Sequence, residues 1–249
     1  MLKSVTDCEP ITQPLIFHLK QRPTWRREPG AITFLKTNRT DLYAAKQWIA
    51  GKKEAIDYAR VTHWVPFVAL ATNIEQLSEI LTRAAGEPRI TAVRGAVRVG
   101  SLEKPVVNRR IHDAPGKEAP DMEDAPRCWL MIDLDSQPEP SDFDWRLDPR
   151  RAAKWAAERY LPEPFRGRPF HYQYSGSAGI KPGLRLHFWF WLTEPRSSAE
   201  LRRYFRRVNS RCKLFDEAIY NAVQPHYTAA PVFLRIEDPL AGNRGGLIQ

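Results

Sequence analysis

The stretch Arg127-Cys-Trp-Leu-Met-Ile-Asp-Leu-Asp135 governs how the rest of the chain is interpreted. Its run of apolar residues, 128–132, leaves no polar face, which predicts a strand buried on both sides near the centre of a sheet. Side chains at positions i and i+2 of a strand point the same way, so Asp133 and Asp135 share one face at its end. Two carboxylates this close repel each other unless a cation joins them, and Mg²⁺ prefers carboxylates together with substrate phosphates. The stretch therefore predicts a divalent-metal site, with two plain turn aspartates as the alternative.

The charge of the chain is strongly positive. Its 249 residues are enough for a large core, in one domain or two small ones, and its formal net charge is +9. Much of this charge comes from the arginine pairs Arg26-Arg27, Arg109-Arg110, Arg202-Arg203 and Arg206-Arg207. Because arginine binds phosphate bidentately, the pairs favour a nucleic-acid or polyphosphate partner. A generally basic, soluble surface is the other interpretation.

Cysteine usage and hydropathy bear on the compartment. Cys8, Cys128 and Cys212 are far apart and form no Cys-x-x-Cys pair. They predict neither a zinc site nor a disulfide framework, as is typical of the reducing cytoplasm. No apolar run approaches the roughly 18 residues of a membrane span, and the N-terminus has no signal-peptide core. We therefore expect a soluble, cytoplasmic protein.

The first half of the chain is predicted to mix strands and helices. Strands are expected at 14–20, 31–36, 66–71 and 90–99, helices at 40–50 and 53–60, and a further helix from the capping box Thr72-x-x-Glu75 to Gly86. The proline-rich stretch 103–126 is interpreted as a long loop or linker. It divides an N-terminal portion, 1–120, from a portion, 121–249, that carries the aspartate pair, and we expect the two to pack as one unit.

The second half continues with clearer signals. Asp148-Pro149 predicts a helix start, and the elements expected after it are a strand at 170–174, a turn at 175–183, a strand at 184–192 and a helix capped by Ser197-x-x-Glu200. The last helix carries arginines on its outer face, at 202, 203, 206, 207 and 211.

The strand 184–192 alternates strictly, which separates an apolar face from a face with Arg185 and His187. The leucines and phenylalanines must face helices, so the arginine and histidine are presented side by side on the other face. The preceding turn contains Ser175, Ser177 and Lys181 and has the composition of a phosphate-binding loop. These residues predict an anion site, whereas His187 as a purely structural sheet histidine is the alternative.

Two residues compete as a third carboxylate. Asp216 follows an apolar pair directly after the arginine-rich helix, whereas Asp238 precedes a proline and has Arg235 nearby to neutralise it. We favour Asp216, although it could equally be the N-cap of a short helix over 218–223.

Taken together, an apolar strand ending Asp-x-Asp, a strand with a histidine and a later apolar-Asp resemble the three motifs of the archaeo-eukaryotic primase superfamily. The resemblance covers 127 to about 238 and is greatest to primase-polymerases of phages, plasmids and integrated elements. It implies an α+β fold, with a central mixed or antiparallel sheet flanked by helices, an RRM-like catalytic half and an N-terminal α/β portion. The chain departs from the family in the second motif, which is usually Ser-x-His and here is Arg185-Leu186-His187.

The resemblance also implies an activity, DNA primase or primase-polymerase, which joins nucleoside triphosphates on a single-stranded DNA template. Asp133, Asp135 and Asp216 would bind Mg²⁺ or Mn²⁺, and His187 would contact the triphosphate. Arg185 and Lys181, with Ser175 and Ser177, would complete the nucleotide site, and the template would contact Arg109, Arg110, Arg202, Arg203, Arg206 and Arg207. A replicative helicase, fused or separate, would be a partner. The choice between ribo- and deoxynucleotides, and between priming and extension, stays open.

Two other functions fit parts of the sequence. A haloacid-dehalogenase-type phosphatase also has a strand ending Asp-x-Asp, but its nucleophile is normally near the N-terminus and Gln137 stands where that family usually has Thr or Val. A non-catalytic replication-origin or single-strand DNA-binding protein would use the basic charge and the eight tryptophans. Metal-dependent primer extension separates the three.

Overall fold

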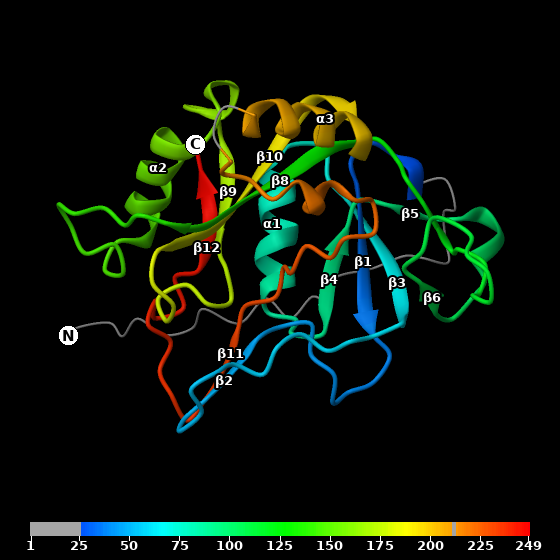
Figure 1. The fold of residues 1–249 in the computed structure, drawn as a ribbon, viewed down its shortest axis with the longest axis horizontal. Coiled ribbons are helices and arrows are strands. Elements are labelled where there is room, and N and C mark those ends of the chain that lie inside the picture. The colour runs from blue at the N-terminus through cyan, green and yellow to red at the C-terminus, as the bar shows by residue number, and fades with distance from the viewer. Residues whose placement is uncertain (1–25, 211–212) are drawn as a thin grey trace, which may run out of the picture.

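The computed structural model describes residues 26–210 and 213–249, so the strand expected at 14–20 lies outside the described residues. The fold is mixed α+β, with two four-stranded antiparallel sheets whose strand orders are β4-β1-β3-β6 and β12-β9-β10-β8 (Figure 1). Two small two-stranded pairings, β11-β2 and β5-β7, complete the described strands. No helix among the described residues is both long and apolar enough to cross a membrane.

The elements before residue 126 are β1 Ala31–Thr37, β2 Gln47–Ile49, β3 His63–Leu70, α1 Ile74–Ala85, β4 Ile90–Val93, β5 Ala96–Val97, η2 Val99–Ser101, β6 Val107–Asn108 and β7 Met122–Glu123. Those after it are β8 Arg127–Gln137, α2 Pro149–Tyr160, η3 Glu163–Phe165, β9 Phe170–Tyr174, β10 Leu184–Arg196, α3 Ser198–Asn209, η4 Glu217–Tyr220, β11 Val232–Leu234 and β12 Gly245–Ile248. Most predicted elements are therefore present, including the caps of α2 by Asp148 and of α3 by Ser197. The cap of α1 is Asn73 rather than Thr72.

Strand β8 is buried as predicted, but its predicted central position is wrong, because it ends its sheet. The N-terminal portion covers this edge instead. The amide of Cys128 donates to the carbonyl of Pro29 at 2.7 Å, and the indole of Trp129 donates to the carbonyl of Ala31 at 2.9 Å. A strand can thus be apolar on both faces at the end of a sheet when a second layer of the fold packs over it.

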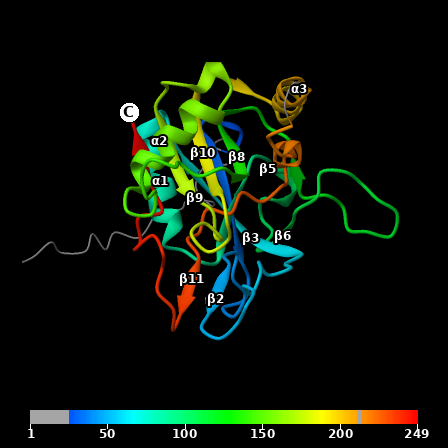
Figure 2. The ribbon, with the colours of Figure 1, turned by 60° about the vertical axis from the view of Figure 1, so that its left-hand side comes forward.

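The second sheet has two differently covered faces (Figure 2). The face with the leucines and phenylalanines of β10 packs on α2, η3 and α3, as predicted: Phe165 of η3 lies between Phe190, at 5.0 Å, and Phe205, at 6.2 Å between ring centroids. The opposite face meets α1 and the first sheet, where Ser78 hydrogen-bonds to His171 at 2.8 Å. Residues of both portions contribute to one hydrophobic cluster.

The helices predicted at 40–50 and 53–60 are absent, and both predictions are wrong. Residues 47–49 instead form β2, which pairs in parallel with β11. The indole of Trp48 donates to the carbonyl of Gly176 at 2.7 Å, so the side chain faces the glycine-rich turn rather than a helical neighbour. Here distant pairing outweighs the local helical pattern, because helix propensity is a weak prior against tertiary contacts.

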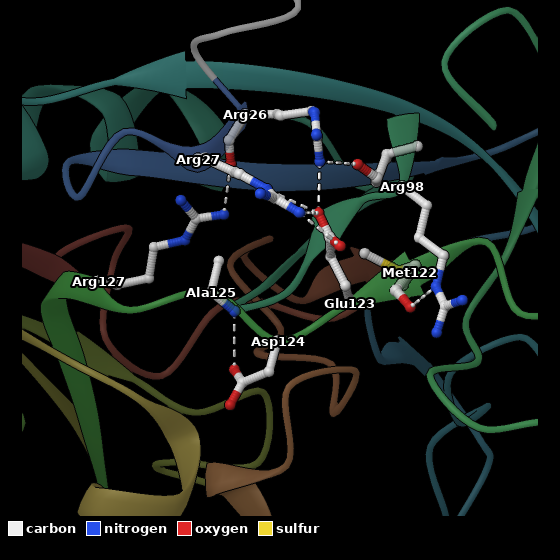
Figure 3. A network of polar contacts seen from close by, with 9 residues as sticks. Arg26, Arg27, Arg98, Met122, Glu123, Asp124, Ala125 and Arg127 are labelled. Atoms are coloured by element: carbon white, nitrogen blue, oxygen red, sulfur yellow. Dashed lines mark hydrogen bonds and ion pairs between the residues drawn. The ribbon is translucent and has the colours of Figure 1, made fainter. Parts of the chain in front are cut away.

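The stretch 103–126 is a long connection that packs against the rest of the fold, and it is not a flexible linker. Buried Asp121 accepts hydrogen bonds from the Ser101 hydroxyl, at 2.6 Å, and from the Asn108 amide, at 2.9 Å. Glu123 pairs with Arg26 at 2.5 Å and with Arg27 at 2.8 Å, as Figure 3 shows. The stretch is proline-rich and non-periodic, but polar contacts to distant residues hold it against the fold.

Buried arginine joins the two portions at the start of β8. The Arg127 guanidinium donates to the carbonyl of Arg26 at 2.9 Å, as Figure 3 shows. It also donates to the carbonyls of Glu28, at 2.8 Å, and Arg94, at 2.9 Å. Burial, with nearby Arg94 adding, lowers the pKa of Arg127 to about 9. Carbonyl acceptors therefore take the place of a carboxylate partner and fix the strand that carries the aspartate pair.

Candidate metal and nucleotide site

The register of β8 and β10 brings the two predicted motifs together. His187 is paired with Asp133, and the distance from its Nε2 to a carboxylate oxygen of Asp133 is 3.6 Å. The register then shifts, because Leu186 pairs with Leu134 but Leu184 pairs with Gln137. This places an extra residue in β8, the arrangement of a β-bulge.

The bulge aims the second aspartate at the arginine. Ser136 has a φ of 56°, the left-handed region that a non-glycine residue rarely adopts. The Arg185 guanidinium hydrogen-bonds to the carboxylate of Asp135 and to the hydroxyl of Ser136. Gly183 has a φ of 82° and fits beside the bulge, since a Cβ there would lie 2.9 Å from the carbonyl carbon of Ser136. Two acids, an arginine and a histidine thus share one end of the β8–β10 pair.

The electrostatics of this cluster favour an added cation. Burial raises the pKa of Asp133, with Asp135 and Asp216 adding to the rise and His187 and Arg185 opposing it. Burial lowers the pKa of His187, against the effect of the two aspartates, so the imidazole is neutral near pH 7. The Nδ1 atom of His187 is buried and has no hydrogen-bond partner among the described residues. The charged form of Asp133 is therefore costly in this protein unless positive charge approaches it.

The donors at this site fit a hard divalent cation, but in this structure they have other partners. No three side chains of His, Cys, Asp or Glu within the described ranges are grouped as metal ligands. Asp135 is hydrogen-bonded to Arg185, and its side chain is 63% exposed. Carboxylate oxygens are the ligands that Mg²⁺ and Mn²⁺ prefer. Asp133 and Asp135 could hold such an ion once Arg185 releases Asp135.

Asp216 and Asp238 have different environments. Asp216 is exposed and caps η4, where its side chain accepts from the Ala218 amide at 2.8 Å, and its charge raises the pKa of Asp133. The capping role is therefore confirmed for this residue, whereas its role as a third carboxylate stays a prediction. Asp238 accepts from two nitrogens of Arg244, at 2.7 and 2.9 Å. The same arginine donates to the carbonyls of Ser175 and Ala178, so Asp238 supports the turn.

The turn at 175–183 uses most of its own amides. The amides of Ser175, Ala178, Ile180 and Lys181 donate to carbonyls of the turn or of β10. The hydroxyl of Ser175 is buried without a partner among the described residues, and Ser177 is buried. Lys181 pairs with Glu54 at 3.5 Å. Anion binding by this turn would therefore depend on side chains and on the remaining amides, more than on a continuous backbone cradle.

Residues that the sequence analysis missed lie next to the site. Lys46 packs on the turn, because a Cβ on Gly176 would lie 3.2 Å from the Lys46 Cβ. Its Nζ is 5.5 Å from the ring centroid of Tyr58. Burial raises the pKa of Tyr58, and the charges of Tyr227, Asp57 and Asp133 add to the rise. Lys46 and Tyr58 come from stretches that the sequence predicts as helices, and nothing in the sequence signals that they meet Tyr227 or the turn.

The predicted template-binding arginines fall into two separate groups (Figure 1). Arg109 and Arg110 follow β6, whereas Arg202, Arg203, Arg206 and Arg207 lie on α3. Arg109 donates to the carbonyl of Val223 at 2.5 Å, and burial lowers its pKa. Of the α3 arginines, Arg206 pairs with Glu217 at 3.3 Å.

The comparisons with known proteins find no similar sequence, and they include a solved structure of low similarity. No protein-family model and no curated protein matches this sequence. Among solved structures, the chain is similar to the polymerase domain from Mycobacterium tuberculosis ligase D in complex with DNA, at 14% sequence identity and a TM-score of 0.26. The similarity covers 90% of this chain and 69% of that chain.

Proposed function

We propose that the protein is a template-dependent nucleotidyltransferase, a DNA primase or primase-polymerase that joins nucleotides on single-stranded DNA with Mg²⁺ or Mn²⁺. The observation that carries the proposal is the β8–β10 register, which sets His187 opposite Asp133 and brings Arg185 to Asp135. Two acids for a metal ion thus lie next to an arginine and a neutral imidazole for a phosphate chain, as nucleotidyl transfer requires. The three motifs occur in the order that the primase superfamily shows.

The residues have distinct roles in this proposal. Asp133 and Asp135 hold the divalent ions, which when bound polarise the α-phosphate and lower the pKa of the attacking hydroxyl. Arg185, once released from Asp135, binds the β- and γ-phosphates. Neutral His187 donates a hydrogen bond to the same phosphates from one ring nitrogen.

An exchange of partners prepares the site. Without ligands, Arg185 neutralises Asp135 and His187 lies beside Asp133. A nucleotide with its ion would bring phosphate oxygens for Arg185 and for the neutral imidazole of His187, and a cation for the two aspartates. All four side chains would then have new partners. Positioning of this kind lowers the barrier, because the entropy of orienting the reactants is lost before the chemical step.

The two other functions receive less support from the fold. The phosphatase alternative would recruit Glu237 and Asp238 to a later motif, but Asp238 is bound by Arg244 on the turn. A non-catalytic DNA-binding protein gives no reason for a partly buried aspartate whose pKa is raised beside a second acid. Perturbed titratable groups of this kind concentrate at catalytic sites.

Metal-dependent incorporation tests the proposal directly. The protein is incubated with primed and unprimed single-stranded templates, with labelled ribo- or deoxynucleotides in separate reactions, and with Mg²⁺ or Mn²⁺. We expect Asp133→Asn and Asp135→Asn to reduce incorporation by about 100-fold or more, because several kcal/mol of charge stabilisation depends on the ion. Asp142→Asn is the matched control. Asp142 is exposed, and its 3.7 Å pair with Arg151 is a surface contact that contributes little to stability. Absence of incorporation by the wild type with either ion, or near-normal activity of Asp133→Asn, would contradict the proposal.

A further inference from the structure

A stacked pair of tyrosines stands beside the candidate site. The ring centroids of Tyr58 and Tyr227 are 3.4 Å apart, and the planes differ by 5°. Both side chains are half-buried, and their rings come from segments 169 positions apart in the sequence. Face-to-face stacking leaves no room between the rings, so the pair can offer only its outer faces to a ligand. Flat aromatic surfaces of this kind stack on nucleobases without regard to sequence.

Polar groups connect this pair to the nucleotide site. Lys46 touches Gly176 of the turn that precedes Arg185, and its Nζ is 5.5 Å from the Tyr58 ring centroid. The lysine is thus positioned between the turn and the tyrosines, where a phosphate beside a stacked base would find a cation.

A basic pocket lies beyond the tyrosine pair. Arg109 donates to the carbonyl of Val223, in the segment that leads to Tyr227, and lines a pocket of about 490 Å³ with Arg110 and Lys117. His63 and Glu118 also line this pocket. The carboxylate of Glu118 lies 2.8 Å from a ring nitrogen of His63, so its partner is this histidine. Within the described part of the chain, neither Arg110 nor Lys117 forms an ion pair with a carboxylate. Both cations are therefore available to an added anion.

We propose that single-stranded nucleic acid leaves the aspartate pair over the Tyr58–Tyr227 stack and lies with its phosphates in the pocket of Arg109, Arg110 and Lys117. This path rests on the proposed function. The sequence analysis assigns DNA binding to two arginine groups, and the path places it on the group in the N-terminal portion. Neighbouring aromatic and cationic groups match the alternating bases and phosphates of a single strand.

The arginines of α3 are less suited to this role. Helix α3 packs through Phe205 and Phe165 toward Phe190, on the face of β10 opposite to His187. The described contacts also neutralise part of that surface, because Arg206 pairs with Glu217 and Arg196 with Glu200.

Two double variants that remove equal charge test the path. Binding of a labelled single-stranded oligonucleotide is measured by fluorescence anisotropy over a range of salt for Arg110→Ala/Lys117→Ala and for Arg203→Ala/Arg207→Ala. We expect only the first to weaken binding and to reduce the salt slope, by about 0.7 for each lost phosphate contact. All four residues lie at least partly at the surface, so both variants should fold, and thermal unfolding checks this.

Substitutions of the tyrosines test the stack. Tyr58→Leu and Tyr227→Leu should weaken binding by on the order of 10-fold, whereas Tyr227→Trp should retain it, because a larger ring still stacks. A loss confined to Arg203→Ala/Arg207→Ala would place the strand on α3, and equal affinities of both double variants would also overturn the path. If the wild type binds along this path but incorporates no nucleotide, the proposed function fails and the path stands. If it incorporates normally while Arg110→Ala/Lys117→Ala binds like the wild type, only the path fails.

Discussion

Two acid–arginine pairs stand at the two ends of the glycine-rich turn, and they differ in how fully the protein satisfies the acid. Asp238 accepts from two nitrogens of Arg244 and from the Leu240 amide, and its side chain is 19% exposed. At the other end, Asp135 meets Arg185 but is largely exposed, and its neighbour Asp133 lies in a site that disfavours its charge. A complete set of donors marks an acid that supports the fold, and an incomplete set marks one that can take a ligand.

The largest expected effect is that Asp133→Asn and Asp238→Asn change nucleotide incorporation and the free energy of unfolding in opposite ways. Asp133→Asn should lose activity and keep the free energy of unfolding, because the charge it removes is unfavourable in the ligand-free protein. Asp238→Asn should do the opposite and lower the free energy of unfolding by about 2 to 3 kcal/mol, since Arg244 would lose its carboxylate while almost buried. Chemical denaturation of both variants beside the incorporation assay measures this. The distinction between the two acids is wrong if Asp133→Asn is the less stable variant.

Added metal should sharpen the same contrast. Mg²⁺ or Mn²⁺ should raise the melting temperature of the wild type, by the equivalent of about 2.7 kcal/mol at 100 times the dissociation constant. The increase should vanish in Asp133→Asn, which lacks the ligand, and persist in Asp238→Asn. Differential scanning fluorimetry with Ca²⁺ and Na⁺ as ionic controls measures this, and equal shifts in both variants would remove the metal from the aspartate pair.

The pH dependence of stability should also differ between the two acids. Burial alone would raise the pKa of Asp238, but hydrogen bonds from Arg244 and from backbone amides outweigh it, so its pKa is lowered from 3.8. Its contribution is therefore present above the unfolded-state pKa and is lost as the pH falls through the lower folded-state value. Asp133 has a raised pKa, so its contribution is present below 3.8 and is lost as the pH rises through the folded-state value. Metal-free unfolding curves from pH 2 to 7, with each Asn variant as reference, should show these opposite trends; parallel curves would contradict them.

The parts of the site that the sequence predicted are those with local signals. Alternation in β10 and the apolar run of β8 place Arg185, His187 and Asp133 at strand ends and on defined faces. The bulge at Ser136 has no such signal, because only pairing with β10 makes the extra residue visible. The pairing of Arg185 with Asp135 depends on that bulge and could not be predicted.

The failures of prediction share one physical cause. Residues 40–60 have an apolar spacing that suits a helix, yet Trp48 is bound to Gly176 and Tyr58 to Tyr227, far along the chain. Such contacts decide the local conformation when propensities differ by a few tenths of a kcal/mol per residue. The contacts of residues 40–60 with the site therefore emerge only from the folded chain, whereas the strand that carries the aspartate pair is evident in the sequence.

The smallest expected effect is on metal and nucleotide affinity when Arg185 is replaced. This arginine pairs with Asp135 in the ligand-free protein. Arg185→Gln removes the cation that neutralises Asp135, so a divalent ion should bind a few-fold more tightly to the nucleotide-free protein, as an exposed pair contributes at most about 1 kcal/mol. Nucleotide should bind more weakly, because the β- and γ-phosphates lose a charged hydrogen bond. Isothermal titration with Mn²⁺ alone, and then with nucleotide at saturating Mn²⁺, separates the two steps. His187→Gln serves as the matched variant on the same strand, since it removes no positive charge near pH 7 and should leave the Mn²⁺ affinity almost unchanged. If Arg185→Gln weakens Mn²⁺ binding instead, the arginine stabilises the metal site rather than competing for it, and the exchange of partners proposed for this site does not occur.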